Sequence, residues 1–350
     1  MNKLTKVGFS ALCGSLAAIT AANAGGLTVT GGVDMSWISL EKETTGNPIG
    51  IGSNLTFKGS GELDNGWTFN LAVAHKNGNA YSAAVVDLTM GGLGTLTFNQ
   101  GDSSTGISAY DNKMPTAWEE PWGNGLSTGV KTVLGVGGSG NVQYKSPTIL
   151  GVTLTAAYAP QVGAGLDVAD KGSGGASSTK GKGMDGVINI NPSLGTEILS
   201  GLNIFAGGHY TDRQKNSSAY DHNLYEAVAG ITYDIGPISL GYGQDGWING
   251  VGTTATAVSH YRGEMYGVAF NINDNLSVSY GFHSTRKAGY VNCSQACASP
   301  DNRLVEVESV QIAYTMGGAS IRVAETEGKN LHFSSGNDKD ATVVSLGLAF

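Results

Sequence analysis

The chain ends in Asp340–Phe350, which reads DATVVSLGLAF. Side chains of a strand alternate between its two faces, so Val344, Leu346, Leu348 and Phe350 share one face, while mostly small residues share the other. In a soluble protein an exposed apolar strand at a terminus promotes aggregation. In an outer-membrane barrel the same strand closes the sheet and faces lipid. The last strand of a soluble sandwich would show the same pattern, so the fold class depends on the rest of the chain.

The N-terminus predicts export from the cytoplasm. A basic start at Lys3 and Lys6 precedes a mostly apolar segment that ends in the A-x-A motif of Ala22–Ala24. This order is typical of a secretory signal peptide. We therefore expect a signal peptide over residues 1–24 and a β-barrel domain over residues 25–350. Beyond the signal the sequence has no apolar run of the roughly 18 residues that a membrane-spanning helix needs.

Composition narrows the class of protein. Removing Lys3 and Lys6 from the 20 basic residues leaves 18 against 28 acidic ones, a net charge of about −10. This acidic balance argues against a nucleic-acid partner. Charged residues make up 14% of the chain and glycine supplies 54 of its 350 residues, whereas soluble domains carry about 25% charged residues. A wall with one lipid-facing and one water-facing side fits this composition.

Alternation of apolar and polar residues predicts sixteen strands. They cover residues 26–40, 50–62, 66–76, 80–90, 93–100, 138–146, 150–160, 184–191, 200–213, 223–234, 237–249, 260–272, 275–289, 303–316, 318–328 and 339–350. Tight turns rich in Gly, Asn, Asp and Pro alternate with longer polar connections, which is typical of a bacterial outer-membrane barrel. Sixteen strands also leave an aqueous channel. We therefore predict an all-β fold, a 16-stranded antiparallel transmembrane β-barrel in the bacterial outer membrane.

Three stretches carry a resemblance to a known family. Ser53–Phe69 reads SNLTFKGSGELDNGWTF, Gly92–Phe98 reads GLGTLTF, and the chain ends on Phe350. These features resemble the general porins of Gram-negative bacteria, of the alphaproteobacterial type. The resemblance implies a homotrimer of sixteen-stranded barrels, in which the third loop folds into the lumen as a constriction.

The third long connection, residues 101–137, is the candidate constriction loop, because loops of this length usually carry function. Its acidic residues are Asp102, Asp111, Glu119 and Glu120. A surface loop with solvated acids would also account for these four residues. However, an outward loop would expose Met114, Trp118 and Trp122 together, and such apolar exposure is unusual. An inward fold is therefore favoured.

Basic residues on the strand face that we expect to line the lumen would lie opposite this loop. They are Lys58, Lys76, Arg213 and Arg322. Each one alone is also consistent with a solvated lumen residue. Together with the acidic loop they predict a transverse electric field, which steers charged and dipolar solutes.

Four charged residues have an ambiguous orientation. They are Arg262, Glu264, Glu306 and Glu308, which share a strand face with Tyr266 or Tyr314. Either they lie above the lipid belt, or a β-bulge shifts their register.

Two cysteines remain in the mature chain, Cys293 and Cys297. In the oxidising environment outside the cytoplasm we expect them to form a local disulfide, because a two-thiolate metal site would lack further ligands nearby. No cofactor is expected. Ca²⁺ could bind among the loop carboxylates, but no EF-hand pattern supports it.

The predicted function is passive diffusion of small hydrophilic solutes and ions, with a weak preference for cations that follows from the acidic excess. The alternatives are a substrate-selective channel in which Trp118 and Trp122 stack on the solute, a barrel hydrolase, and a surface structural protein. No enzymatic activity is expected, because the six histidines show no metalloprotease spacing and no evident serine partner.

Overall fold

The computed structural model describes residues 26–77, 79–163, 180–191, 200–213, 222–250, 258–287 and 304–349. The predicted signal peptide, the connection 192–199, Cys293, Cys297 and Phe350 lie outside the described residues. No helix in the described part of the chain is long and apolar enough to cross a membrane.

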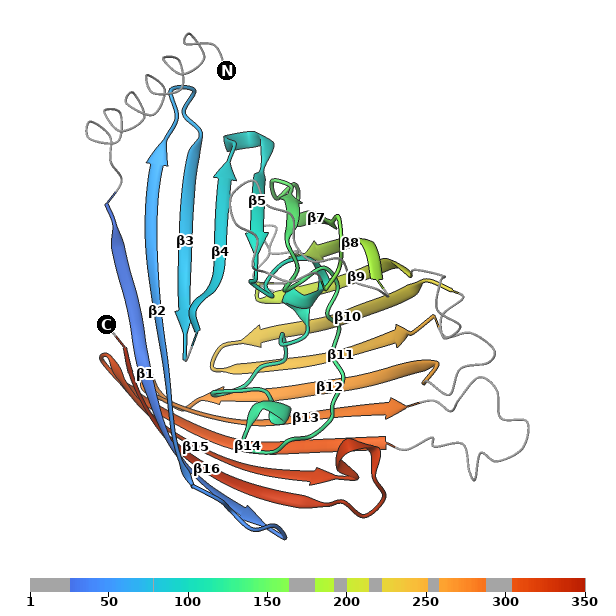
Figure 1. The fold of residues 1–350 in the computed structure, drawn as a ribbon. Coiled ribbons are helices and arrows are strands. Elements are labelled where there is room, and N and C mark those ends of the chain that lie inside the picture. The colour runs from blue at the N-terminus through green and yellow to red at the C-terminus, as the bar shows by residue number, and fades with distance from the viewer. Residues whose placement is uncertain are drawn as a thin grey trace.

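Within these residues the strands form one closed antiparallel barrel (Figure 1). They are β1 (Thr28–Glu41), β2 (Ile49–Glu62), β3 (Thr68–Lys76), β4 (Asn79–Thr89), β5 (Thr95–Gln100), β6 (Asn141–Lys145), β7 (Val152–Ala159), β8 (Lys180–Ile190), β9 (Leu202–Arg213), β10 (Leu224–Ile235), β11 (Ile238–Ile248), β12 (His260–Asn271), β13 (Leu276–Lys287), β14 (Leu304–Met316), β15 (Ala319–Lys329) and β16 (Lys339–Ala349). Each strand pairs with its neighbours in sequence, and β1 pairs with β16 to close the sheet. The predicted all-β, 16-stranded barrel is confirmed.

The strand boundaries differ from the predicted ones mainly in two places. β8 begins at Lys180 instead of residue 184, because pairing with β9 continues past an irregularity and joins Lys180 to Arg213. The lysine and glycine residues of this stretch show no apolar alternation, which is why the sequence pattern missed it. β6 begins at Asn141, so the third loop runs from residue 101 to residue 140.

The two faces of β16 show how the wall is built. Val344 and Leu348 are each 43% exposed on the outside of the barrel, whereas Val343 and Ser345 are buried on the inside. This is the alternation expected of a wall with a lipid-facing side. The period-2 pattern at the C-terminus therefore predicted the correct faces.

The four residues of ambiguous orientation lie on the outer face. The pairing of β12 with β13 and of β14 with β15 runs without a register shift, so no bulge turns Arg262 or Glu308 inward. The Tyr280 hydroxyl donates a hydrogen bond to Glu308 over 2.6 Å. These charges thus belong to the surroundings of the barrel and not to its lumen.

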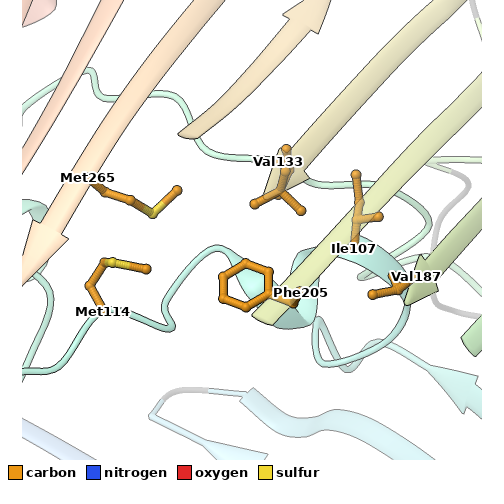
Figure 2. Close-up of a cluster of buried hydrophobic side chains, with 7 residues drawn as sticks. Ile107, Met114, Val133, Val187, Phe205 and Met265 are labelled. Atoms are coloured by element: carbon orange, nitrogen blue, oxygen red, sulfur yellow. The ribbon is translucent and has the colours of Figure 1, made fainter. Parts of the chain in front are cut away.

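The third loop lies inside the barrel, where Figure 1 shows its green ribbon crossing in front of the inner wall. A cluster of buried side chains joins the loop to the wall, with Ile107, Met114 and Val133 from the loop and Val187, Phe205, Val228 and Met265 from β8, β9, β10 and β12 (Figure 2). Two smaller clusters hold Leu126 against β14 and β16, and Val136 against β7. Burial of these apolar side chains stabilises the inward position of the loop.

Glycines in the inner wall make room for the loop. A Cβ atom at Gly267 in β12 would lie 2.5 Å from the carbonyl oxygen of Pro115, and one at Gly241 in β11 would lie 2.4 Å from Cδ of the same proline. Gly281 in β13 lies beneath Pro121 in the same way. The loop therefore rests directly on the backbone of the wall.

Replacing Gly267 with valine is expected to push the loop away from β12 and into the open passage, because the contact is with backbone atoms that cannot rotate aside. The single-channel conductance should fall. Gly59→Val is the control, because a Cβ atom at Gly59 would meet nothing within 4 Å. Equal conductance of the two variants would show that the loop does not border the passage at this point.

Candidate functional site

A buried carboxylate in β8 holds both ends of the third loop. Asp185 Oδ2 accepts hydrogen bonds from the backbone N–H groups of Ile107 (2.8 Å) and Val136 (3.2 Å). Its other oxygen lies 2.5 Å from Nδ1 of His209, which is also buried. Both carboxylate oxygens are thus occupied, and the two ends of the loop meet on one side chain.

Further wall residues hold the loop along its length. Glu226 Oε2 in β10 accepts hydrogen bonds from the N–H groups of Leu134 (2.6 Å) and Gly135 (3.0 Å). Gln311 in β14 accepts from the N–H of Glu119 (3.0 Å) and donates to the carbonyl oxygen of the same residue (2.6 Å). The backbone of Glu119 is therefore fixed from both sides.

Glycine is required at two loop positions that border Asp185. Gly106 and Gly135 have φ values of +63° and +53°, which residues with a Cβ atom rarely adopt. A Cβ atom at Gly135 would also lie 2.3 Å from Asp185 Oδ2. Backbone conformation and close approach both exclude a larger residue here.

The loop brings together three of the four predicted acidic residues. Burial, the hydrogen bond with Glu120 and the charge of Glu120 raise the pKa of Glu119 to about 7, against the opposing charges of Lys76 and Arg322. Burial, followed by the charge of Glu120, raises the pKa of Asp111 to about 6. We call Asp111, Glu119 and Glu120 the acidic group; its members influence one another electrostatically.

Two of the four predicted basic residues lie close enough to act on this group, since Lys76 and Arg322 both oppose the upward shift of the Glu119 pKa. The Arg322 guanidinium lies 4.8 Å from the ring centroid of Trp118 in the loop. It also donates to Asp34 over 2.5 Å and to Ser345 over 2.8 Å. A stacked and doubly hydrogen-bonded guanidinium keeps its charge in one position.

The other two basic residues lie elsewhere. Lys58 and Asp102 line a separate hollow of about 660 Å³ between β2–β4 and the start of the loop. Arg213 is buried at the end of β9, where it donates to the Asn249 side chain over 2.8 Å. The alternation of side chains along the strand predicted that Arg213 lies on the inner face. It did not predict that residues after β11 bury this side chain. Arg213 is therefore not grouped with Lys76 and Arg322.

Three residues that hold the loop, Asp185, Glu226 and Gln311, were not singled out from the sequence, nor was Asp34, which binds Arg322. These residues could have been found as carboxylates or amides on the inner face of predicted strands. The basic residues were chosen by the same criterion, their place on the inner face. Among the described residues, no group of three or more His, Cys, Asp or Glu side chains is placed to hold a metal ion.

Residues 9–350 match the sequence profile of the Gram-negative porins. The chain belongs to this family. No curated protein sequence is significantly similar to it.

Solved structures share the fold of this porin. OmpF of Salmonella typhi, in a complex with daunomycin, superposes with a TM-score of 0.68 at 12% identity, over 93% of this chain and 97% of that chain. The outer-membrane channel DcaP of Acinetobacter baumannii gives 0.65 at 12% identity, over 94% and 98%. An anion-selective porin from Comamonas acidovorans gives 0.61 at 14% identity, over 93% and 99%. The protein is thus an outer-membrane channel of the porin family and not an enzyme.

Proposed function

We propose that this porin lets small hydrophilic solutes and ions diffuse passively across the outer membrane, with a weak preference for cations. The observation that carries the proposal is the acidic group on the third loop, which faces the charges of Lys76 and Arg322. Opposed charges in a narrow aqueous passage produce a transverse field that orders water and acts on charged and dipolar solutes. The constriction would therefore select by size and charge, without a binding cleft.

A homotrimer of the alphaproteobacterial type is part of this proposal and rests on the motifs of Ser53–Phe69 and Gly92–Phe98. The disulfide between Cys293 and Cys297 stays a prediction, as does the signal peptide over residues 1–24.

The substrate-selective alternative would use Trp118 and Trp122 as stacking surfaces. One face of the Trp118 ring is already covered by the Arg322 guanidinium at 4.8 Å. Trp122 lines a narrow space beneath the loop together with Phe282 and His283. The Arg322 guanidinium thus leaves at most one face of the Trp118 ring for a solute, which supports general diffusion.

Liposome swelling with uncharged sugars of increasing size tests the proposal. General diffusion predicts rates that fall smoothly with solute size and no sugar that blocks ion current. A sugar that enters faster than smaller ones, or that blocks current at low concentration, would instead indicate a selective binding track.

The cation preference is expected to depend on pH. A carboxyl group whose pKa is raised carries its negative charge only above the raised value, so acidification through about 7 neutralises Glu119, and through about 6 neutralises Asp111. The permeability ratio of K⁺ to Cl⁻ should therefore fall between pH 8 and pH 5. Reversal potentials in a KCl gradient measure this ratio. In the Asp111→Asn/Glu119→Gln variant this fall of the permeability ratio with pH should disappear. A fall of unchanged size would show that other groups cause it.

A further inference from the structure

Two adjoining hollows lie in the lumen between β2–β6 and the start of the third loop. The larger has a volume of about 660 Å³ and the smaller one of about 370 Å³. They open to the inside of the barrel, because Asp87 directly opposes the buried Thr97, whereas the adjacent Phe98 is exposed on the outer face. Four residues line both hollows, namely Asn70, Val85, Asp87 and Ser104. The two hollows therefore meet at these residues.

Asp87, at the boundary of the two hollows, has a free carboxylate oxygen. Thr97 donates a hydrogen bond to its Oδ1 atom over 2.6 Å. Among the described residues, no hydrogen bond or ion pair reaches its Oδ2 atom. This oxygen can therefore accept a hydrogen bond from an ammonium group of a solute.

The smaller hollow has one charge of each sign. Of the residues that line it, only Asp87 and Lys145 are charged. Lys145 is exposed and forms no ion pair within the described part of the chain. Hydroxyl and amide side chains form most of the remaining lining, namely Asn70, Thr89, Thr95, Thr97, Asn99, Ser104, Thr105 and Gln143. The smaller hollow thus offers an anionic and a cationic group with hydrogen-bonding side chains around them.

The strand register fixes the separation of these two charges. Asp87 lies two residues from Thr89 in β4. Thr89 pairs with Thr95 in β5, and Thr95 pairs with Lys145 in β6. Two strand spacings and two residues along the strand place the Cα atoms of Asp87 and Lys145 about 12 Å apart. A solute that carries both an ammonium and a carboxylate group can bridge the two side chains.

A second lysine, Lys58, lies equally far from Asp87 on the other side. Lys58 pairs with Ala72, and Ala72 pairs with Val85, two residues before Asp87. However, Lys58 shares the larger hollow with another carboxylate, Asp102. The smaller hollow is therefore the better place for the carboxylate group of a solute.

The larger hollow has an apolar floor. Its inner-face residues on β3 and β4 include four small apolar ones, namely Ala72, Ala74, Ala83 and Val85. Ala72 and Val85 are directly opposed, and Val85 also lines the smaller hollow. An apolar group that extends from the smaller hollow over this floor would be removed from water, which favours its binding.

We propose that this space binds an α-amino acid zwitterion with an apolar side chain. The ammonium group binds to Asp87, the carboxylate binds to Lys145, and the side chain covers Ala72 and Val85. Hydrogen bonds between ionised partners are stronger than those between neutral ones, so both charges of the solute contribute. Uncharged sugars lack both charges and pass without binding. The inference rests on the proposed open passage, through which the amino acid reaches the site.

The test measures uptake at pH 7 by proteoliposomes that contain the mature protein, with protein-free liposomes as the background. L-Leucine carries both charges, N-acetyl-L-leucine keeps only the carboxylate, and L-leucinamide keeps only the ammonium group. Leucine uptake should saturate, with a half-saturating concentration at least about tenfold below that of either analogue, because each analogue loses one set of charge-assisted hydrogen bonds. Arabinose uptake should stay proportional to concentration, which shows that the passage is open.

Two variants each remove one charge from the site. Asp87→Asn and Lys145→Gln should each raise the half-saturating leucine concentration about tenfold. In Asp87→Asn the remaining oxygen still accepts a hydrogen bond from Thr97, so the wall keeps this contact. Lys58→Gln is the matched control, because Lys58 lies equally far from Asp87, and it should leave the value unchanged. Conductance in about 1 M KCl, where lumen charges are screened, verifies that each variant is folded.

Leucine uptake that rises in proportion to concentration, as arabinose uptake does, would overturn the proposal. So would equal half-saturating concentrations of leucine and N-acetyl-L-leucine, because the ammonium group would then not be bound. An equal loss in Lys58→Gln and Lys145→Gln would also overturn it, because the overall charge of the lumen would then set leucine uptake. Arabinose that does not enter would overturn this inference together with the proposed function.

Discussion

Replacement of Asp185 with alanine is expected to lower the free energy of unfolding by about 2–6 kcal/mol, because two buried N–H groups lose their acceptor at about 1–3 kcal/mol each. These are the N–H groups of Ile107 and Val136, at the two ends of the third loop. The Nδ1 atom of His209 also loses its partner. The loop should leave the wall for part of the time, and open-channel current noise should rise.

Denaturant unfolding in detergent micelles, together with noise analysis of single channels, measures both effects. Asp185→Asn keeps one oxygen as acceptor and should cost less. Asp87→Ala is the matched control, since Asp87 lies on the inner wall of β4 and bonds to Thr97 at 2.6 Å instead of to the loop. If Asp185→Ala and Asp87→Ala destabilise the protein equally, the hydrogen bonds of Asp185 do not hold the loop.

The Glu119→Gln/Glu120→Gln variant is expected to lose most of the cation preference. A unit charge acts on an ion about 8 Å away in water with about 0.5 kcal/mol, roughly a twofold effect on permeability for each charge removed. The permeability to K⁺ should therefore fall by up to about fourfold at a pH well above 7, where Glu119 carries its charge, and the permeability ratio of K⁺ to Cl⁻ should fall with it. Reversal potentials in a KCl gradient give this ratio.

Glu327→Gln removes one carboxylate from the outer face, where Glu327 pairs with Lys329 at 3.1 Å. Its reversal potential should equal that of the unmodified protein. A Glu119→Gln/Glu120→Gln variant that also behaves like the unmodified protein would place the selectivity outside the third loop.

The strands were predictable because the two faces of each strand lie in different environments. In Val343–Leu348, for example, every second side chain faces lipid and the others face the inside of the barrel. This alternation of apolar and other residues is visible in the sequence and predicts the strand. β8 was predicted too short because its first residues pair with β9 without burying apolar side chains. There the hydrogen-bonded neighbour, which the sequence alone does not reveal, decides where the strand begins.

The site was predictable only in part, for the same physical reason. Glu119 and Arg322 could be assigned to a loop and to an inner face from local pattern. Their approach depends on Gln311, which fixes the backbone of Glu119, and on Asp34, which orients Arg322. These contacts join residues up to 288 positions apart in the sequence, so a local sequence pattern does not indicate them.

Single-channel recording of the refolded mature protein in a planar bilayer tests whether the barrel encloses a water-filled passage bordered by an acidic third loop. We expect large stepwise openings, closures in groups of three at high voltage, and a reversal potential in a KCl gradient that indicates preference for K⁺. Correctly folded protein without conductance would contradict the open passage, and a preference for Cl⁻ would contradict the role of the acidic group.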